Sequence, residues 1–150
     1  MNRKKPIVIS GPCAAESFEV MDAAAQLLSN LQKELDFDFY FKASFDKANR
    51  TALDSYRGSG LDQTMTWFSD IKSKYGCKVL TDIHETQQVD RVAEVCDGLQ
   101  IPAFLCRQTD LVVKAVQTQK FVNIKKGQFL APKSTEHIAQ KVKDLSLIHI

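Results

Sequence analysis

The order of strand-like and helix-like segments constrains the fold of this chain more than any other feature. A short run rich in β-branched and aromatic residues is followed by a segment with helical spacing of apolar residues, and this pairing occurs five times. Strands that alternate with helices in this way predict a parallel sheet with the helices outside it. The predicted strands are Ile7–Ser10, Phe39–Ser44, Lys78–Thr81, 98–105 and 121–129.

Apolar residues spaced three and four apart predict a helix after each strand. Ser17 is a favourable N-cap for the first helix, and the second spans Leu61 to Tyr75 and ends at Gly76. The stripe of the first helix is Met21, Ala24, Leu28, Leu31 and Leu35. The other helices are predicted over 86–95, around Leu111, Ala115 and Val116, and from Ser134 or Thr135 through Ile138 and Val142.

Two architectures fit this order: an open doubly wound sheet and a (β/α)8 TIM barrel. An open sheet gathers its ligand residues at one switch point, whereas a barrel places them after many strands. No G-x-G-x-x-G follows a strand, so the usual dinucleotide signal is missing. The barrel is therefore favoured. The polar residues near the strand ends are Cys13, Lys42, Lys47, Asp82, His84, Arg107, Lys125 and Gln128.

The length of the chain indicates an incomplete barrel. A (β/α)8 barrel typically takes about 250 residues, whereas this chain has 150 and supplies five strands. We expect residues 1–144 to form the N-terminal portion of a single barrel domain, and the apolar ending from Leu145 to Ile150 to be a foreign tail. Half a barrel leaves its first and fifth strands as unpaired edges, so the isolated chain is expected to be inactive and poorly soluble.

Composition excludes several classes of partner. The net charge of +2 is too weak for a general nucleic-acid-binding field, and no apolar run approaches the about 20 residues that span a bilayer. The first apolar run is too short for a signal peptide. The four cysteines form no C-x-x-C pair, which predicts reduced thiols that mostly occupy the core. We expect a cytoplasmic protein that binds neither nucleic acid nor membrane.

Lysines within strand-like segments suggest an anion site. Lys42 is the one charge in an apolar strand, and "NIKKG" repeats the pattern. A lysine that faces a barrel interior must be paired or desolvated, and either condition favours anion binding. The alternatives are a side chain that reaches solvent at the strand end, or a salt bridge from Lys42 to Asp46 or Asp82. For Arg50 and Arg57 alone, a solvated loop is the favoured interpretation.

Five longer segments carry a family resemblance. The segments "KASFDKANRT", "SYRGSG", "TDIHE", "QIPAFLCRQTDL" and "NIKKGQFLAP" occur in this order. They resemble 3-deoxy-D-manno-octulosonate 8-phosphate synthases over residues 7–143. The resemblance implies a (β/α)8 barrel, a homotetramer, and the condensation of phosphoenolpyruvate with D-arabinose 5-phosphate for the inner core of lipopolysaccharide. This chain corresponds to about the first half of that family's length.

The resemblance also implies roles for individual residues. The residues expected to act on phosphoenolpyruvate are Lys42, Lys47, Asp82 and Lys125, with Gln100, Pro102 and Ala103 lining the same pocket. The sugar phosphate is assigned to Asn49, Arg50 and Thr51, where many relatives have serine at the last position. Arg107 resembles an arginine that reaches the sugar phosphate of a neighbouring subunit. Gln128 is a further candidate substrate-binding residue.

Cys13 indicates a metal-dependent subclass. Metal-dependent members resemble this chain in having cysteine in the "GPC" loop, whereas metal-independent members have asparagine there. A thiolate is a soft ligand that suits zinc, iron or a manganese-like ion better than magnesium. The other ligands implied by the resemblance lie outside this chain. His84 is expected to be structural, His137 solvated, and His149 part of the doubtful tail.

Two rival functions stay open. The 3-deoxy-D-arabino-heptulosonate 7-phosphate synthases share the barrel and the phosphoenolpyruvate chemistry, but they typically have K-P-R where this chain has "KANR". That difference favours the five-carbon sugar. The second rival is a non-catalytic fragment that binds phosphorylated ligands or assembles with a partner chain.

Overall fold

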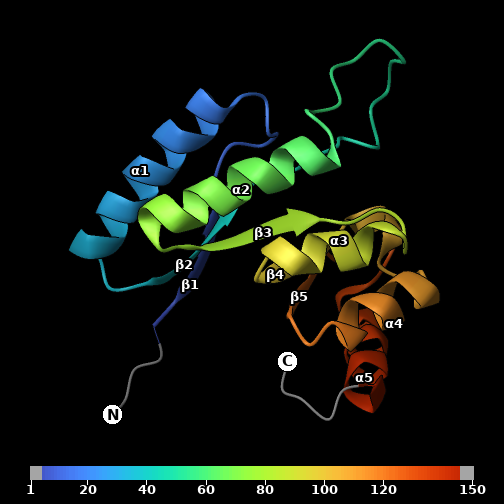
Figure 1. Cartoon of the computed structure of the whole chain (residues 1–150). Helices are drawn as coiled ribbons and strands as arrows, with labels where there is room; N and C mark the ends of the chain where they lie inside the picture. Colours follow the sequence, from blue (N-terminus) through green and yellow to red (C-terminus); the bar gives the residue numbers. More distant parts are fainter. Residues whose placement is uncertain (1–4, 146–150) are drawn as a thin grey trace. The chain divides into compact units, whose positions relative to one another are not determined.

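The computed structural model describes residues 5–145. Within that range five strands alternate with five α-helices (Figure 1), which confirms the predicted element order. The strands are β1 (Ile7–Ser10), β2 (Asp38–Lys42), β3 (Lys78–Asp82), β4 (Gly98–Ile101) and β5 (Phe121–Ile124). The helices are α1 (Phe18–Glu34), α2 (Leu61–Tyr75), α3 (Gln88–Val95), α4 (Thr109–Gln117) and α5 (Thr135–Leu145), with short 3₁₀ helices η1 (Ala103–Leu105) and η2 (Pro132–Ser134).

The chain divides into two compact units, one that extends to Thr81 and one that begins at Asp82. In the first unit β1 pairs with β2 and β2 pairs with β3, all in parallel. Ser10 lies opposite Phe41, so β1 and β2 end side by side and their following loops leave from the same edge. This register places the Cys13 loop next to the residues that follow β2.

The helices of the first unit begin and end largely where the sequence predicts. The Ser17 side chain accepts a bond from the Val20 N–H, and Gly76 ends α2 with a φ of 63°, a left-handed conformation that suits glycine. The buried side of α2 includes Met65, Phe68 and Ile71, as the periodicity predicts.

The predicted face of α1 is confirmed at Met21 and displaced after it, with Ala24, Leu28 and Leu31 only half-buried. The buried residues of α1 are Met21, Ala25 and Ser29, whereas Leu35 is exposed and lies after the helix. Small side chains at Ala25 and Ser29 let α1 approach its neighbours α2 and β2 closely, and the longer leucines lie beside this contact. Leucine spacing alone marks the apolar side of a helix without fixing its line of closest approach.

The second unit contains the parallel pair β4 and β5, with Gly98 opposite Phe121 and Ile101 opposite Ile124. Both strands are shorter than predicted. Pro102 ends β4 because it has no N–H for the ladder, and the chain turns into η1. After Ile124 only the Lys125 N–H continues the pattern, donating to the Ile101 carbonyl at 3.0 Å.

Strand exposure agrees with an incomplete (β/α)8 barrel, of which this chain forms an N-terminal part. Ile7 and Ile9, which share one face of β1, are 56% and 36% exposed, and in residues 5–145 β1 pairs only with β2. All four residues of β5 are half-buried. Parallel strands of a closed barrel are covered on both faces. Residues 146–150, most of the predicted foreign tail, lie outside the described residues. No helix between residues 5 and 145 is long and apolar enough to cross a bilayer.

Candidate active site

Two lysines converge on one buried hydroxyl where β2 ends. Lys42 Nζ donates to Ser44 Oγ at 2.7 Å, and Lys47 Nζ donates to the same oxygen at 2.8 Å. The two ammonium nitrogens can therefore be no further apart than the sum of two hydrogen-bond lengths. Ser44 is fully buried. Two like charges held this close concentrate positive charge where β2 ends.

The loop after β1 is attached to the same point. Ala14 forms an isolated parallel bridge with Ser44, the Ala15 N–H donates to the Ser44 carbonyl at 2.9 Å, and the Ser44 N–H donates to the Cys13 carbonyl at 3.3 Å. The Lys47 ammonium also donates to the Cys13 carbonyl. Gly11 fits here because a Cβ would lie 2.2 Å from the Lys42 carbonyl oxygen. These bonds hold the thiol-bearing loop against the lysines.

Cys13 has the electrostatic environment of a thiolate. Its side chain interacts with Lys47, which lowers the pKa of the thiol below its ordinary value, and the charges of Lys42 and Arg50 lower it further. Cys13 is exposed, whereas Cys77, Cys96 and Cys106 are buried. All four are free thiols, as predicted. Cys13 is therefore the one cysteine that combines access with a stabilised anionic form.

The predicted sugar-phosphate residues of the first unit lie in the long loop between β2 and α2. Asn49, Arg50 and Thr51 are all exposed there, and Figure 1 shows the loop extending away from α1 and α2. The Arg57 guanidinium forms a two-point ion pair with Asp46. Asp46 is thus engaged by Arg57, which argues against its serving as the salt-bridge partner of Lys42.

The second unit places an acid and an imidazole at the end of β3. Asp82 is only 7% exposed, and its Oδ2 lies 3.1 Å from His84 Nε2. The backbone N–H of His84 donates to Gln88 Oε1 at 2.8 Å, so the His84 backbone is bonded to the first residue of α3. This agrees with the structural role predicted for His84. His137 is exposed, as expected.

The remaining candidates follow β4 and β5 within the same unit. Gln100 accepts a bond from Asn123 Nδ2 at 3.0 Å, which links the two strands through their side chains. Pro102 and Ala103 are half-buried. Lys125 begins the loop after β5. The exposed members of the predicted set in this unit are Arg107, Lys125 and Gln128.

Three residues of the first unit were not identified from the sequence. Ser44 is the shared acceptor of the lysines, and Tyr56 and Ser59 bond the carbonyls that follow Cys13. Alternation along β2 gives a weak signal for Ser44, which lies two residues after Lys42 and therefore on the same side. The roles of Tyr56 and Ser59 depend on contacts across more than forty residues, for which sequence spacing offers no signal.

The described residues hold no complete set of metal ligands. Among residues 5–145, no three His, Cys, Asp or Glu side chains are grouped to hold an ion. Cys13 fits one position of a transition-metal site, because the nearby cations favour the thiolate that such ions require.

The alternation of parallel strands with helices defines part of a (β/α)8 barrel, in which two lysines cluster where β2 ends. A family model described as "DAHP synthetase I family" matches residues 2–148, and the chain belongs to this family. Among curated relatives, the "2-dehydro-3-deoxyphosphooctonate aldolase" of Wolinella succinogenes is 56% identical over 135 residues, which cover 90% of this chain and 51% of the relative.

Two further relatives carry the same name. The Helicobacter hepaticus protein is 54% identical over 135 residues, covering 90% of this chain and 50% of the relative. The Helicobacter pylori protein is 52% identical over 146 residues, covering 95% and 53%. These matches confirm the resemblance identified from the sequence motifs. The chain spans about half the length of the curated relatives it matches.

Proposed function

We propose that the whole protein condenses phosphoenolpyruvate with D-arabinose 5-phosphate and water, giving 3-deoxy-D-manno-octulosonate 8-phosphate and inorganic phosphate. This reaction supplies lipopolysaccharide inner-core synthesis in the cytoplasm, and the active form is a homotetramer. The observation that carries the proposal is the convergence of Lys42 and Lys47 beside Cys13. Relatives named for this product support the choice of reaction.

Phosphoenolpyruvate is matched by the cations at the strand ends. It carries a carboxylate and a phosphate, which need fixed donors with charge-assisted bonds. Lys42 and Lys47 supply two such donors in the first unit. In the second unit, we assign Lys125, Asp82 and the segment from Gln100 to Ala103 to the same substrate, as the family resemblance implies.

The β2–α2 loop is proposed to bind the sugar phosphate. Arg50 supplies the charge, while the Asn49 amide and the Thr51 hydroxyl supply neutral donors; all three side chains are exposed. Arg107 contributes to the sugar-phosphate site of a neighbouring subunit, and Gln128 binds substrate from the loop after β5. The exposure of the loop supports this assignment because a ligand can reach it without disturbing the core.

The proposed reaction forms one carbon–carbon bond and breaks one carbon–oxygen bond. C3 of phosphoenolpyruvate attacks the aldehyde carbon of the sugar, and the aldehyde oxygen takes up a proton. Water adds to C2, and the bond from C2 to the phosphate oxygen breaks to release inorganic phosphate. Lys42 and Lys47 stabilise the negative charge on the departing phosphate. Removing one preorganised donor of this kind commonly costs about 10²–10³ in rate.

Cys13 would hold a divalent transition ion through its thiolate. Such an ion supplies Lewis acidity that orients the aldehyde or activates water. Lys47 assists by keeping the thiol ionised, and its bond to the Cys13 carbonyl fixes the loop. The remaining ligands would come from the part of the whole protein beyond this chain.

Turnover by the whole protein tests the proposal. Phosphate release is measured with phosphoenolpyruvate and either arabinose 5-phosphate or erythrose 4-phosphate, before and after chelation. The expected result is metal-dependent turnover with the five-carbon sugar, lost in Lys47→Met and retained in Lys33→Met, which removes a lysine from the last turn of α1. Turnover with the four-carbon sugar alone would refute the assignment. The 150-residue chain by itself is expected to be inactive.

A further inference from the structure

We propose that residues 56–60, here called the strap, are a positioning element that fixes the Cys13 loop against the lysine cluster, with the hydroxyls of Ser59 and Tyr56 as its functional groups. The inference rests on the proposed function for the role of Cys13, but the contacts themselves do not depend on it. The strap lies in the β2–α2 loop, immediately before α2.

The first side of the strap bonds the backbone after Cys13. Ser59 Oγ donates to the Ala15 carbonyl at 2.9 Å, and the Tyr56 hydroxyl approaches the same carbonyl at 3.3 Å. Both hydroxyls also lie within 3.4 Å of the Glu16 carbonyl, and they are 3.2 Å from each other. Two side chains from one short segment thus converge on two consecutive carbonyls of another loop.

The second side of the strap bonds the backbone around Lys47. The Lys47 N–H donates to the Arg57 carbonyl at 2.6 Å, and the Gly60 N–H donates to the Phe45 carbonyl at 3.1 Å. At Gly58, with a φ of 132°, a Cβ would lie 2.3 Å from the Phe45 carbonyl oxygen. Only glycine allows this close approach. The strap therefore bonds both the loop that carries Cys13 and the backbone near Lys47 in its own loop.

Ala15 is the point through which the strap acts on Cys13. It is fully buried, its N–H donates to the Ser44 carbonyl at 2.9 Å, and its own carbonyl receives the Ser59 hydroxyl. Removing the Ser59 hydroxyl leaves a buried carbonyl with a weaker partner, and buried acceptors without good partners are destabilising. Because Ala15 lies two residues after Cys13, loss of this bond loosens the thiol.

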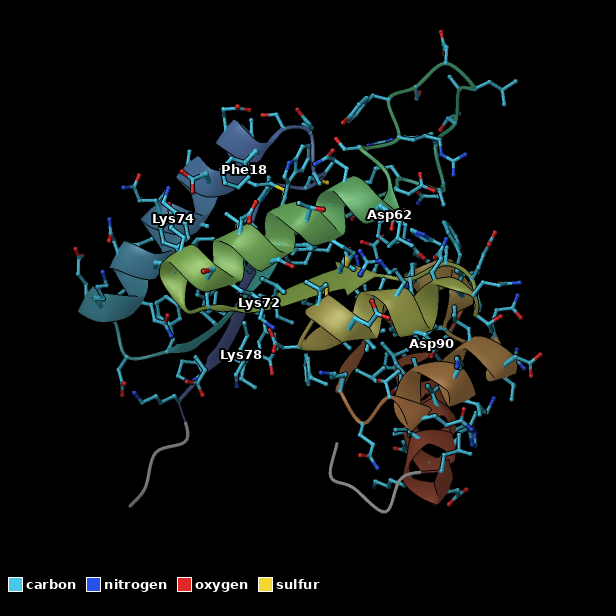
Figure 2. All side chains as sticks on the ribbon, viewed as in Figure 1. Phe18, Asp62, Lys72, Lys74, Lys78 and Asp90 are labelled. Carbon is cyan, nitrogen blue, oxygen red and sulfur yellow. The ribbon has the colours of Figure 1, made fainter. Side chains whose placement is uncertain are left out.

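The position of the strap also suits this role. Figure 2 labels Phe18 at the beginning of α1 and Asp62 at the beginning of α2. The loop that carries Cys13 enters α1 at Phe18, and the strap enters α2 just before Asp62. Each loop thus continues directly into a helix, and the hydroxyls of the strap bond the loop that carries Cys13 just before its helix begins.

Amide hydrogen exchange in the whole, metal-free protein tests the contacts. Ser59→Ala is expected to speed exchange at the Ala15 and Ser44 amides by about fivefold to tenfold, the effect of one net hydrogen bond. Ser59→Thr keeps the hydroxyl and should restore protection. Ser69→Ala is the matched control, because it removes a bond of the same kind, from Ser69 Oγ to the Met65 carbonyl at 3.0 Å. Unchanged exchange in Ser59→Ala would overturn the proposal.

Zinc affinity, measured by competition with a chromophoric chelator, tests the effect on Cys13. Ser59→Ala should weaken zinc binding about fivefold to tenfold, which corresponds to the loss of one net hydrogen bond that supports the loop, and Ser59→Thr should restore it. Loosened amides with wild-type zinc affinity would overturn the positioning role. Cys13→Ser is measured in parallel, and unchanged zinc affinity in this variant would refute the proposed metal role of Cys13. The hydrogen-exchange result would still decide whether Ser59 holds the Cys13 loop in place.

Discussion

Substituting Gly11 by alanine should displace the Cys13 loop from β2. The new Cβ would lie 2.2 Å from the Lys42 carbonyl oxygen and 3.0 Å from the Lys42 carbonyl carbon and nitrogen. Ordinary contacts begin near 3.4 Å, so the backbones must separate by more than about 1 Å, since no flexible side chain can yield. Overpacking costs about 1–3 kcal/mol. Because the new Cβ clashes with the backbone of Lys42, the loss of stability in Gly11→Ala should lie near the upper end of this range.

Gly76→Ala is the matched control for this prediction. Gly76 has a φ of 63°, and a Cβ added there would meet no atom within 4 Å, so alanine incurs only the strain of a left-handed backbone, about 1–2 kcal/mol. With a urea slope of about 1–3 kcal/mol per molar, the urea midpoint of unfolding should fall about twice as far in Gly11→Ala as in Gly76→Ala. Equal shifts, or a larger shift for Gly76→Ala, would refute the reasoning from close approach.

Three further outcomes are expected. In metal-free protein, the midpoint of Cys13 alkylation against pH should lie below the ordinary thiol value of about 8.5, and Lys47→Met should move it upward because the cation that stabilises the thiolate is removed; an unchanged midpoint contradicts this. Phe68→Ala should lower the free energy of unfolding, measured in urea, by about 3–5 kcal/mol, since its side chain is fully buried. The pKa of Tyr75 is raised by burial and by the Asp22 carboxylate, so Asp22→Asn should lower it in an NMR titration of ring-labelled tyrosine.

Strand positions were predictable because local sequence determines them. The runs at Ile7–Ser10 and Lys78–Thr81 are apolar or β-branched and bounded by polar loops, and both form strands at those positions. The end of β4 was not predicted, although proline marks it: an apolar segment continues past Pro102, but the missing N–H stops the ladder. Apolar content alone therefore overestimates strand length.

Some contacts of the candidate site were also predictable from the sequence, and others were not. Parallel strands that end at one edge bring Lys42 and the Cys13 loop together, and this rule works from sequence because neighbouring strands can be inferred from their order. The partner of Asp46 was not predictable, since Arg57 reaches it through the fold of a long loop. Bonds from side chains to distant backbone, such as Ser59 to Ala15, leave no periodic pattern in the sequence.

The electrostatics of the lysine cluster link the fold to the proposed ligand. Lys42 and Lys47 are half-buried and both donate to one hydroxyl, so two like charges lie close together and repel one another. The β1–α1 loop, Ser44 and the strap hold them in place despite this repulsion. An anion bound between the two lysines would replace repulsion by two attractions, and because the donors are already fixed, little ordering cost remains at binding. A site preorganised in this way favours a ligand with concentrated negative charge, as a phosphate or carboxylate group has.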